Sequence, residues 1–583
     1  MRAPTCDSTG IPGFVATLAL IGLCVVLSNE ARADLGGDWG LTLEATQYGS
    51  IEAIAMDAQG NHYISGSFEG TIQIGNNGPS YQSPSDRDVF VAMLSPTGDH
   101  IWSTISEGAG DEGTADLAIL PDGSVAVVGF TFSNPFGFQG SMQPGKGMSD
   151  AWGAVFSPTG SLVWVSVWGG ESTDSATTVA VNVSGQGTST IIGGHFRNTV
   201  DFGLGSRTSQ GQDDWFLLEH KSAGPILADA VFGGTASELN CNIDVDDAGS
   251  VFLLGSSAGP LDLGNGPLSP KGSFDIVLAK LPGVGSLATW SQRFGSVETD
   301  HGNSIVLGED GTIYVGGAFS GAIDLGNVTL VSNGARDGWI AAFDPAGGFG
   351  WAQSMGGSGE DRVSSVATEG SVLAITGNFS DTATFGPFGA NAFDTDQDVF
   401  VATLDTDGNW LNFGIGSGPD SDSGLDIALH GWPVVVGGFF DRVKFGTFNF
   451  LDQTGGFEGY LVHLTESSSS VPGAGPTGPA AQMLEAFPAQ PNPFRGETVV
   501  SFRSVDATGS AGSDASARAT IRVTVHDIVG RVVRTLAPAL AGDSGTVTWD
   551  GRDRAGLALP SGVYYIRLAT PLGSDVVPVT IQR

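Results

Sequence analysis

Short apolar segments separated by turn residues recur along most of this chain of 583 residues. The segments are rich in Val, Ile, Leu, Phe and Trp, and between them lie Gly, Asn, Asp and Pro, as expected of β-strands joined by tight turns. Asp122-Gly123 and Asp310-Gly311 each separate two such segments, and Asp-Gly supplies the positive φ angles that a hairpin turn requires. The pattern predicts an all-β chain with almost no helix.

One apolar segment occurs seven times, directly after an acidic residue and with a period of roughly 61 residues. A second segment in the same period ends in Gly, often with an aromatic residue two positions later, as in Gly317-Ala318-Phe319. Each period holds about four short strands, which is the content of one propeller blade. The repeat therefore predicts a seven-bladed β-propeller over residues 34–465. The seven acidic residues are Asp88, Asp150, Asp214, Asp275, Asp337, Asp398 and Glu458.

A further strand, which contains Trp in all but the third of the first six periods, follows the acidic segment in each of those six periods but is missing after the seventh. A matching segment, DWGLTL, occupies residues 38–43. We therefore expect this N-terminal strand to complete the last blade and close the ring, which leaves no exposed junction edge.

The blades resemble the bacterial SBBP-type β-propeller repeats, with their acidic-aromatic strands, Gly-Gly-x-Phe strands and Asp-x-x-Gly turns. The resemblance covers residues 35–465 and implies a propeller and export rather than a particular activity. Residues 342–351, which end in Trp351, also look like the tryptophan-docking motif of quinoprotein propellers, in which the Trp holds neighbouring blades together. A quinoprotein dehydrogenase would need cofactor and calcium ligands and usually eight blades.

A second domain follows a segment that is rich in Ser, Pro and Gly at residues 466–486, which we interpret as a linker. Residues 487–583 contain short alternating segments that predict a small Ig-like β-sandwich. Pro491-Asn492-Pro493-Phe494, the VHDIVGR motif at 525–531 and Gly562-Val563-Tyr564-Tyr565 resemble the FlgD-like Ig domain and the sorting domain of type IX secretion substrates. The resemblance implies a role in secretion or cell-surface attachment, with secretion machinery as a partner; a simple Ig-like spacer is the alternative.

The N-terminus has the organisation of a signal peptide. Residues 14–27 are apolar or small, Arg2 precedes them, and Ala31-Arg32-Ala33 matches the small-x-small pattern of a cleavage site. We predict a signal peptide over residues 1–33 with cleavage between Ala33 and Asp34. The apolar run is shorter than the roughly 20 residues of a spanning helix, so no transmembrane segment is expected in the mature chain. The protein is therefore expected to be secreted or on the outer surface of a bacterial cell.

Charge and candidate chemistry narrow the functional classes. The net charge of −38 opposes binding to nucleic acid or anionic lipid. The eight His residues follow no zinc-binding spacing, and Cys241, the one cysteine of the expected mature chain, is interpreted as a small buried residue. Asp405, Asp407 and Asn409 have the spacing of a calcium loop but lack its bidentate Glu. A hairpin turn is the favoured interpretation; no cofactor is expected, and calcium is the one cation left open.

Acidic residues also recur before each new blade, at Asp111, Asp174, Asp300 and Asp361. A group repeated in every blade favours a structural hydrogen bond over an active site, although an acidic ring is the alternative. The sequence therefore predicts an exported, non-catalytic propeller that binds an extracellular protein or glycan or serves a structural role. The alternative is a secreted hydrolase or lyase that acts on polysaccharide in the propeller channel, where two carboxyl groups from different blades could pair.

Overall fold

The computed structural model describes residues 34–583 except 185–186, 223, 393–395, 441, 447, 452–456, 468–482, 487–489, 506–521, 527–531, 542–543, 555 and 571–572. Every regular element in these residues is a strand, which confirms the all-β prediction. Within the same residues no helix is long and apolar enough to cross a membrane. The predicted signal peptide and Ala33 lie outside the described residues, and Asp34 is the first residue of β1.

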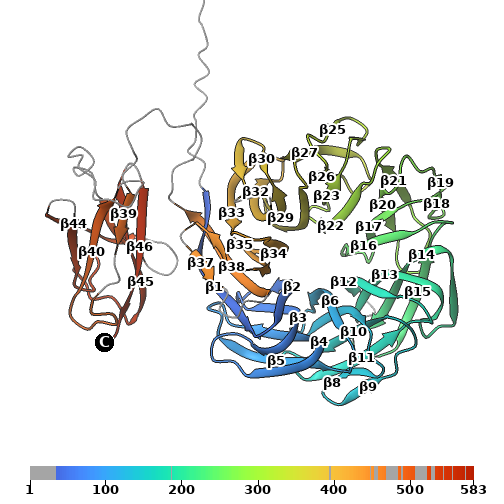
Figure 1. The fold of residues 1–583 in the computed structure, drawn as a ribbon, viewed down its shortest axis with the longest axis horizontal. Coiled ribbons are helices and arrows are strands. Elements are labelled where there is room, and N and C mark those ends of the chain that lie inside the picture. The colour runs from blue at the N-terminus through green and yellow to red at the C-terminus, as the bar shows by residue number, and fades with distance from the viewer. Residues whose placement is uncertain are drawn as a thin grey trace, which may run out of the picture. The chain divides into compact units, whose positions relative to one another are not determined.

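Seven antiparallel groups of four strands follow one another through the described part of residues 34–467 (Figure 1). From the innermost strand outward they are β2 (Tyr48–Met56), β3 (His62–Gln73), β4 (Ser80–Leu94), β5 (His100–Glu107); β6 (Glu112–Ile119), β7 (Val125–Thr131), β10 (Asp150–Phe156), β11 (Leu162–Trp168); β12 (Ser175–Ser184), β13 (Gly187–Asp201), β14 (Ser206–Lys221), β15 (Ile226–Phe232); β16 (Glu238–Val245), β17 (Val251–Ser257), β20 (Asp275–Leu281), β21 (Trp290–Phe294); β22 (His301–Leu307), β23 (Ile313–Phe319), β26 (Asp337–Phe343), β27 (Phe349–Gly357); β28 (Arg362–Glu369), β29 (Val372–Ser380), β32 (Gln397–Asp405), β33 (Trp410–Ser417); and β34 (Ser423–His430), β35 (Trp432–Phe439), β38 (Glu458–Ser467), β1 (Asp34–Ala45).

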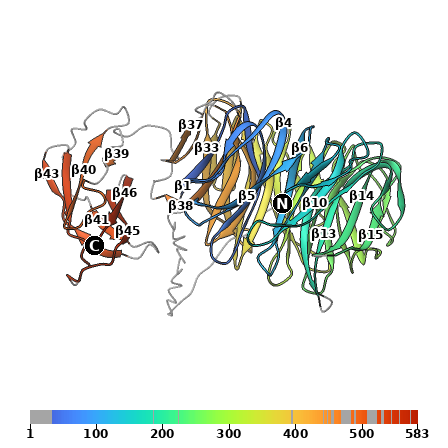
Figure 2. The ribbon, with the colours of Figure 1, turned by 90° about the horizontal axis from the view of Figure 1, so that it is seen from below.

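The innermost strands form a closed ring. Each of β2, β6, β12, β16, β22, β28 and β34 contacts the next, and β34 contacts β2. The blades therefore radiate from a central channel, seen face-on in Figure 1 and from the side in Figure 2. This arrangement is a β-propeller.

The two ends of the propeller segment meet in one blade. β1 pairs antiparallel with β38 from Asp34 opposite Ser467 to Leu43 opposite Gly459, with an irregularity near Trp39. β38 pairs in turn with β35, so the N-terminal strand is the outermost strand of the seventh blade. Leu43, with no exposed surface, packs into the core beside the first blade.

The core lies between neighbouring blades because the middle strands are buried on both faces. All seven residues of β10 are buried, and so are all seven of β26. The cluster between the fifth and sixth blades, for example, combines Tyr314 and Ile340 with Leu373 and Phe400. The apolar middle strands recognised in the sequence thus provide packing surfaces on both sides.

Additional contacts join neighbouring blades at their outer edges. Short hairpins between the second and third strands of a blade pair with the outermost strand of the preceding blade: β8 (Phe136–Phe138) with β5, β30 (Thr382–Phe385) with β27, and β36 (Arg442–Phe445) with β33. Their hairpin partners are β9 (Ser141–Gln143), β31 (Phe388–Asn391) and β37 (Phe448–Leu451), and two further hairpins are β18 (Leu261–Asp262) with β19 (Pro267–Leu268) and β24 (Ala322–Asp324) with β25 (Thr329–Val331).

Tryptophan side chains of outermost strands bond to turns of the next blade. Trp351 Nε1 donates to the carbonyl oxygen of Thr406 at 2.8 Å, and Trp290 Nε1 donates to that of Pro345 at 3.3 Å. A Cβ on Gly408 would lie 2.6 Å from the Trp351 ring, so the turn glycine leaves room for the indole. These contacts have the role that the tryptophan-docking resemblance implies.

The C-terminal part has two four-stranded sheets of its own. One contains β39 (Met483–Ala486), β40 (Thr498–Val505), β44 (Ser544–Trp549) and β43 (Ala539–Ala541); the other contains β42 (Val532–Leu536), β41 (Arg522–His526), β45 (Gly562–Thr570) and β46 (Gly573–Ile581). Their inner faces share a core that includes Phe502, Trp549 and Ile566. This part is the predicted Ig-like β-sandwich.

Candidate functional site

The predicted calcium loop lies in the turn between β32 and β33. Asp405 Oδ1 accepts hydrogen bonds from the backbone amides of Asp407 at 3.0 Å and Asn409 at 2.8 Å, while Oδ2 accepts one from Asn409 Nδ2 at 2.9 Å. Asp246 makes the same bonds to the amides of Ala248 and Ser250. The bonds have the form of an Asx turn, and calcium binding at Asp405, Asp407 and Asn409 stays a prediction. Among the described residues, no three His, Cys, Asp or Glu side chains gather as a metal site.

Cys241 lies in the core of β16 with no exposed surface. Burial raises the pKa of its thiol to about 12, so the thiolate form that a nucleophile requires is absent at neutral pH.

Two acidic side chains meet at six of the seven blade junctions formed by described residues. One begins the third strand of a blade, and the other, which we call the junction acid, lies at the start of the next blade. Burial raises the pKa of the junction acid in each pair, and the charge of the first acid adds to the increase. The pairs are Asp88 with Glu112, Asp150 with Asp174, Asp214 with Glu238, Asp275 with Asp300, Asp337 with Asp361, and Asp398 with Asp422.

Most junction acids accept hydrogen bonds that hold a loop. Asp361 Oδ2 accepts from the amide of Gly357 at 2.8 Å, and Oδ1 accepts from that of Ser380 at 3.0 Å. Asp174 and Asp300 make equivalent pairs of bonds. The periodic acids of the sequence therefore have the structural hydrogen bonds that we favoured.

Asp111 was assigned to this series incorrectly. It is exposed and accepts a hydrogen bond from the backbone amide of Arg87 at 3.1 Å. The buried position belongs to Glu112, which bonds to Thr131 and Ser106. Two adjacent acids make the register ambiguous in the sequence, and only the pairing of β6 with β7 separates them.

Three further carboxyl groups join the innermost strands around the channel. Asp116 Oδ2 accepts from the amide of Val179 in the next blade at 2.8 Å, and Oδ1 accepts from its own neighbour Leu117. Asp244 bonds to Leu307 and Val245 in the same way. Asp426 bonds to Ile54 and Ile427, and it also accepts from the Ser365 hydroxyl. Each of these carboxyl groups thus bridges two blades.

The environment of these bridging groups raises their pKa values. Burial, assisted by the nearby Asp426, raises the pKa of Asp116 to about 7, and burial raises that of Asp244 to about 6. A carboxyl group with a pKa near 7 suits general acid catalysis. However, both oxygens of Asp116 accept backbone amides, and the same arrangement recurs at Asp244, which favours a structural role.

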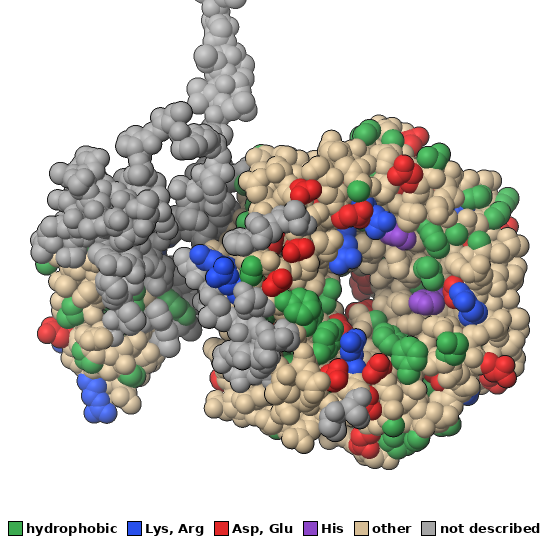
Figure 3. Space-filling view, viewed as in Figure 1, with side chains coloured by type: hydrophobic (Ala, Val, Ile, Leu, Met, Phe, Trp, Pro, Cys, Tyr) green, Lys and Arg blue, Asp and Glu red, His purple; other side chains and the backbone are tan. Residues whose placement is uncertain are grey.

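A group of basic side chains lies where two innermost strands begin, at what we call the rim of the channel. β22 begins with His301 and β28 with Arg362, and Arg336 directly precedes β26. Burial, together with the charge of Arg336, lowers the pKa of Arg362 and that of His301, and Glu360 opposes the shift at Arg362. We call Arg336, Arg362 and His301 the rim cluster. Figure 3 shows Lys or Arg and His side chains on one side of the channel opening.

The rim cluster has few acidic partners. Glu360 lies 3.8 Å from Arg336, and Arg362 donates to Asn378 Oδ1 at 3.3 Å. Among the described residues, Arg362 makes no ion pair. Burial and the charge of Arg336 lower the pKa of His301, so His301 is neutral at neutral pH and the positive charge belongs to the two arginines.

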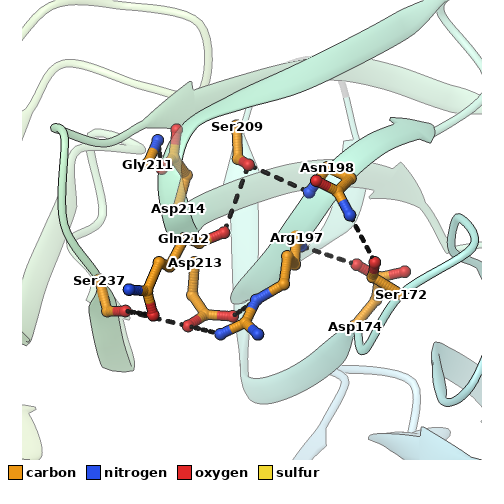
Figure 4. Close-up of polar contacts among 10 residues, drawn as sticks. All are labelled: Ser172, Asp174, Arg197, Asn198, Ser209, Gly211, Gln212, Asp213, Asp214 and Ser237. Atoms are coloured by element: carbon orange, nitrogen blue, oxygen red, sulfur yellow. Dashed lines mark hydrogen bonds and ion pairs between the residues drawn. The ribbon is translucent and has the colours of Figure 1, made fainter.

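The basic residue of the third blade is arranged differently. Arg197 holds Asp213 through two hydrogen bonds of 3.0 and 2.7 Å, and Ser237 donates to the same carboxylate (Figure 4). The Arg197 backbone amide in turn donates to Asp174. Because its charge is neutralised by Asp213, this arginine supports the loops of the blade rather than offering a charge to solvent.

Aromatic side chains continue the rim across the seventh and first blades. The Phe440 ring, 44% exposed, packs on Phe457 with centroids 4.8 Å apart, and Phe457 stacks on Tyr48 at 5.4 Å. The Arg87 guanidinium lies 4.2 Å from the centre of the Tyr48 ring. Exposed aromatic rings beside arginine are typical of binding surfaces.

The rim cluster is not visible in the repeat, because its residues differ from those at equivalent positions of the other blades. The residue that follows the junction acid is uncharged in four blades, Gly113, Ser175, Leu239 and Ser423, but it is His301 and Arg362 in two neighbouring ones. Alignment of the repeats on their junction acids would reveal this departure.

Comparison with known proteins gives one domain match. The FlgD Ig-like domain family matches residues 499–573. The regulatory protein FlaEY of Caulobacter vibrioides is 25% identical over 219 residues, which cover 35% of this chain and 22% of that protein. The match thus spans about a fifth of the length of this relative.

Solved structures show weaker similarity. PorZ, a surface component of the type-IX secretion system of Porphyromonas gingivalis, is 11% identical with a TM-score of 0.14, covering 93% of this chain and all of that one. CoXyl43, a GH43 β-xylosidase/α-arabinofuranosidase from a compost microbial metagenome, is 13% identical with a TM-score of 0.25, covering 51% and 93%. TM-scores this low do not establish a common fold, so neither structure bears on function.

The fold and the domain match together define the class: a β-propeller followed by a FlgD-like Ig domain. The rim, with its arginines and the exposed ring of Phe440, is accessible to a partner.

Proposed function

We propose that the protein is an exported, non-catalytic propeller of the SBBP-repeat type that binds an extracellular protein or glycan at its rim. The observation that carries the proposal is the contrast between acidic and basic groups at this end of the channel. The junction and channel acids described above accept backbone hydrogen bonds in repeat after repeat, whereas Arg362 and the exposed rings of Phe440 and Phe132 break the repeat. Irregular groups on a regular scaffold are where function is expected.

The composition of residues 1–33 and the C-terminal domain support export. The N-terminal sequence has the pattern of a signal peptide, and the FlgD Ig-like match agrees with the resemblance to type IX sorting domains. We propose that the C-terminal domain serves secretion or attachment at the cell surface and that secretion machinery is one of its partners.

The channel offers a second candidate function, cleavage of a polysaccharide by a hydrolase or lyase reaction. The observation in its favour is that burial, assisted by the charge of the nearby Asp426, raises the pKa of Asp116 to about 7, as expected for the acid in a pair of glycosidase carboxyl groups. The hydrogen bonds that the two carboxyl groups accept from the backbone amides of Val179 and Ile54 weigh against this function. The carboxyl oxygens would have to be released from these bonds before they could act in catalysis.

The experiment that separates the two functions uses residues 34–583 on a panel of bacterial and plant glycans and on cell-surface protein extracts. We expect binding without release of reducing ends or unsaturated products. Turnover by the parent protein that disappears in Asp116→Asn and persists in Asp405→Asn would contradict the proposal and establish the enzyme. Asp405 is a suitable control because it also accepts backbone amides but lies in a turn away from the innermost strands.

A further inference from the structure

We propose that the Phe440 ring is a stacking platform for one pyranose ring of a neutral glycan. The inference rests on the proposed binding function and assigns it a class of ligand and a place on the rim. It is carried by three rings in contact, Phe440, Phe457 and Tyr48, which we call the aromatic row. The row crosses the junction between the seventh and the first blade, which we call the closing junction.

The closing junction departs from the other junctions of the propeller. Elsewhere, as at Ser149 and Thr173, two residues form a parallel bridge between neighbouring blades, and an acid follows each of them. Phe457 and Tyr48 form the same bridge, but Tyr48 is followed by Gly49, where the other junctions have a junction acid. Stacked rings therefore occupy the place where polar residues and an acid pair recur.

Ring contacts hold the row in one arrangement. The Tyr48 and Phe457 rings are nearly parallel, at 16°, with centroids 5.4 Å apart, and the Arg87 guanidinium lies 4.2 Å from the centre of the Tyr48 ring. A Cβ on Gly438 would overlap the Phe457 ring, so this glycine lets the ring lie against β35. The Phe440 ring packs on Phe457 at an angle of 62°. A side chain that is already held by its neighbours loses little conformational freedom when it binds a ligand.

Phe440 is the exposed end of the row. It follows the last residue of β35 and is 44% exposed, whereas Phe457 and Tyr48 are half-buried. The equivalent residues of the fourth and fifth blades are the small Ala258 and Ser320. Hydrophobic side chains are visible at the edge of the channel opening in Figure 3. The exposed ring is therefore a departure from the repeat that packing alone does not require.

The small exposed apolar surface of the row favours a sugar over a protein partner. A protein interface of standard size buries about 800 Å² of each partner, far more than one ring offers. The face of a single ring instead matches the apolar face of a single pyranose.

The charge of the chain selects among glycans. A net charge of −38 repels a polyanionic glycan, and stacking on a phenyl ring requires no charge on the ligand. A neutral glycan with flat apolar faces is therefore the ligand that fits Phe440.

The test is calorimetric titration of residues 34–583 with cellohexaose, a neutral hexasaccharide with flat apolar faces, and with hexagalacturonate, an anionic one. We expect cellohexaose to bind at least about tenfold more tightly. Phe440→Ala should weaken its binding about ten- to a hundredfold, as expected when one large apolar side chain is no longer covered.

Two further variants separate a flat ring from apolar character in general. Phe440→Tyr keeps the ring and should retain the affinity, whereas Phe440→Leu keeps an apolar side chain without a flat face and should lose most of it. Val297→Ala is the control, because Val297 is an 82% exposed apolar residue in the loop before β22, at another junction. It should leave the affinity unchanged.

The outcomes separate this inference from the proposed function. Equal affinities of the parent, Phe440→Ala and Phe440→Leu would overturn the platform while leaving a binding propeller, and so would tighter binding of hexagalacturonate. Failure of the parent to bind cellohexaose would also overturn it, and the wider panel then decides the proposed function alone. Binding of a decaproline peptide in place of cellohexaose, lost in Phe440→Ala, would replace the glycan by a protein partner. Unchanged melting temperatures of the variants verify that the fold is intact.

Discussion

At the residue scale, the two acids Asp361 and Asp422 occupy the same place in successive blades but have different surroundings. Asp361 accepts two backbone amides. Asp422 is 1% exposed, and neither of its buried oxygens has a hydrogen-bond partner in the structure. Burial, together with Asp398 and Asp420, raises the pKa of Asp422 to about 9. Asp422 is therefore protonated at neutral pH, unlike its counterpart.

This difference predicts that the same substitution lowers stability at Asp361 but hardly at Asp422. Asp361→Asn replaces an acceptor oxygen by an NH2 group that faces an amide donor, which should lower the free energy of unfolding by about 1–3 kcal/mol. Asp422→Asn resembles the protonated carboxyl group, so its effect should stay within about 0.5 kcal/mol. Urea unfolding of both variants at pH 7.5 measures the two values. A larger loss in Asp422→Asn than in Asp361→Asn would be inconsistent with a protonated Asp422.

Buried acids also predict how stability depends on pH. Burial raises the pKa of Glu112 to about 8 and that of Glu52 to about 7. An acid with a raised pKa in the folded state stabilises the fold fully below its unfolded pKa of about 4. That stabilisation is lost as the pH rises through the folded value. Buried His62, with a pKa lowered to about 4, acts oppositely, because its contribution is lost as the pH falls below about 6.5.

Between pH 6.5 and pH 9, therefore, the buried acids determine how the stability changes with pH. We expect the propeller to melt a few degrees lower at pH 9 than at pH 6.5, since one pKa unit corresponds to about 1.4 kcal/mol. Glu112→Gln should reduce this difference, whereas the control Glu298→Gln, at an exposed residue, should not. Differential scanning calorimetry across the range provides the measurement. A melting temperature that rises toward pH 9 would contradict the assignment of protonated acids.

At the scale of elements, β1 closes the ring through pairing with a strand more than four hundred residues away in sequence. Its Leu35 and Leu43 are buried, and its Trp39 ring stacks on His463 with centroids 6.1 Å apart. Without β1 the long edge of β38 would be exposed, and an exposed edge strand promotes aggregation.

Deletion of residues 34–45 should therefore destabilise the whole propeller. Burial of each leucine alone contributes about 1.5–3 kcal/mol, and the backbone ladder adds to it, so we expect the melting temperature to fall by at least about 10 °C or the protein to aggregate. A thermal scan of the truncated protein checks this. Deletion of residues 483–583 is the control that should leave the propeller transition in place, and an unchanged transition after loss of β1 would show that the ring does not depend on it.

The sequence predicted the strands better than it predicted the site. Periodic apolar segments are sufficient to place the middle strands such as β10 and β26, because a strand that is buried on both faces needs an unbroken apolar run. The short hairpin strands are visible in the sequence, as in Thr384-Phe385-Gly386, but their pairing with the preceding blade, such as β30 with β27, is not, since each strand uses only three or four residues. The rim cluster depends on two strand ends and one loop meeting in space, and no spacing within one repeat encodes that meeting.

At the scale of the molecule, the propeller and the C-terminal domain each contain a separate core. The C-terminal cluster draws all its residues from Phe494 to Ile581, and the other clusters draw theirs from Leu35 to Leu464. Domains with independent cores and a Ser, Pro and Gly-rich connection between them generally unfold independently.

We therefore expect two calorimetric transitions from residues 34–583. A protein that ends at residue 467 should reproduce one of them with the same midpoint, and residues 483–583 should reproduce the other. The pH dependence argued above belongs to the first transition, because Glu52 and Glu112 lie in the propeller; the second should shift little between pH 6.5 and pH 9. A single transition in the full chain would mean that the two domains stabilise each other, and so would a propeller midpoint that moves when the C-terminal domain is removed. An Ig-like domain that acts only in secretion or attachment has no need of such coupling.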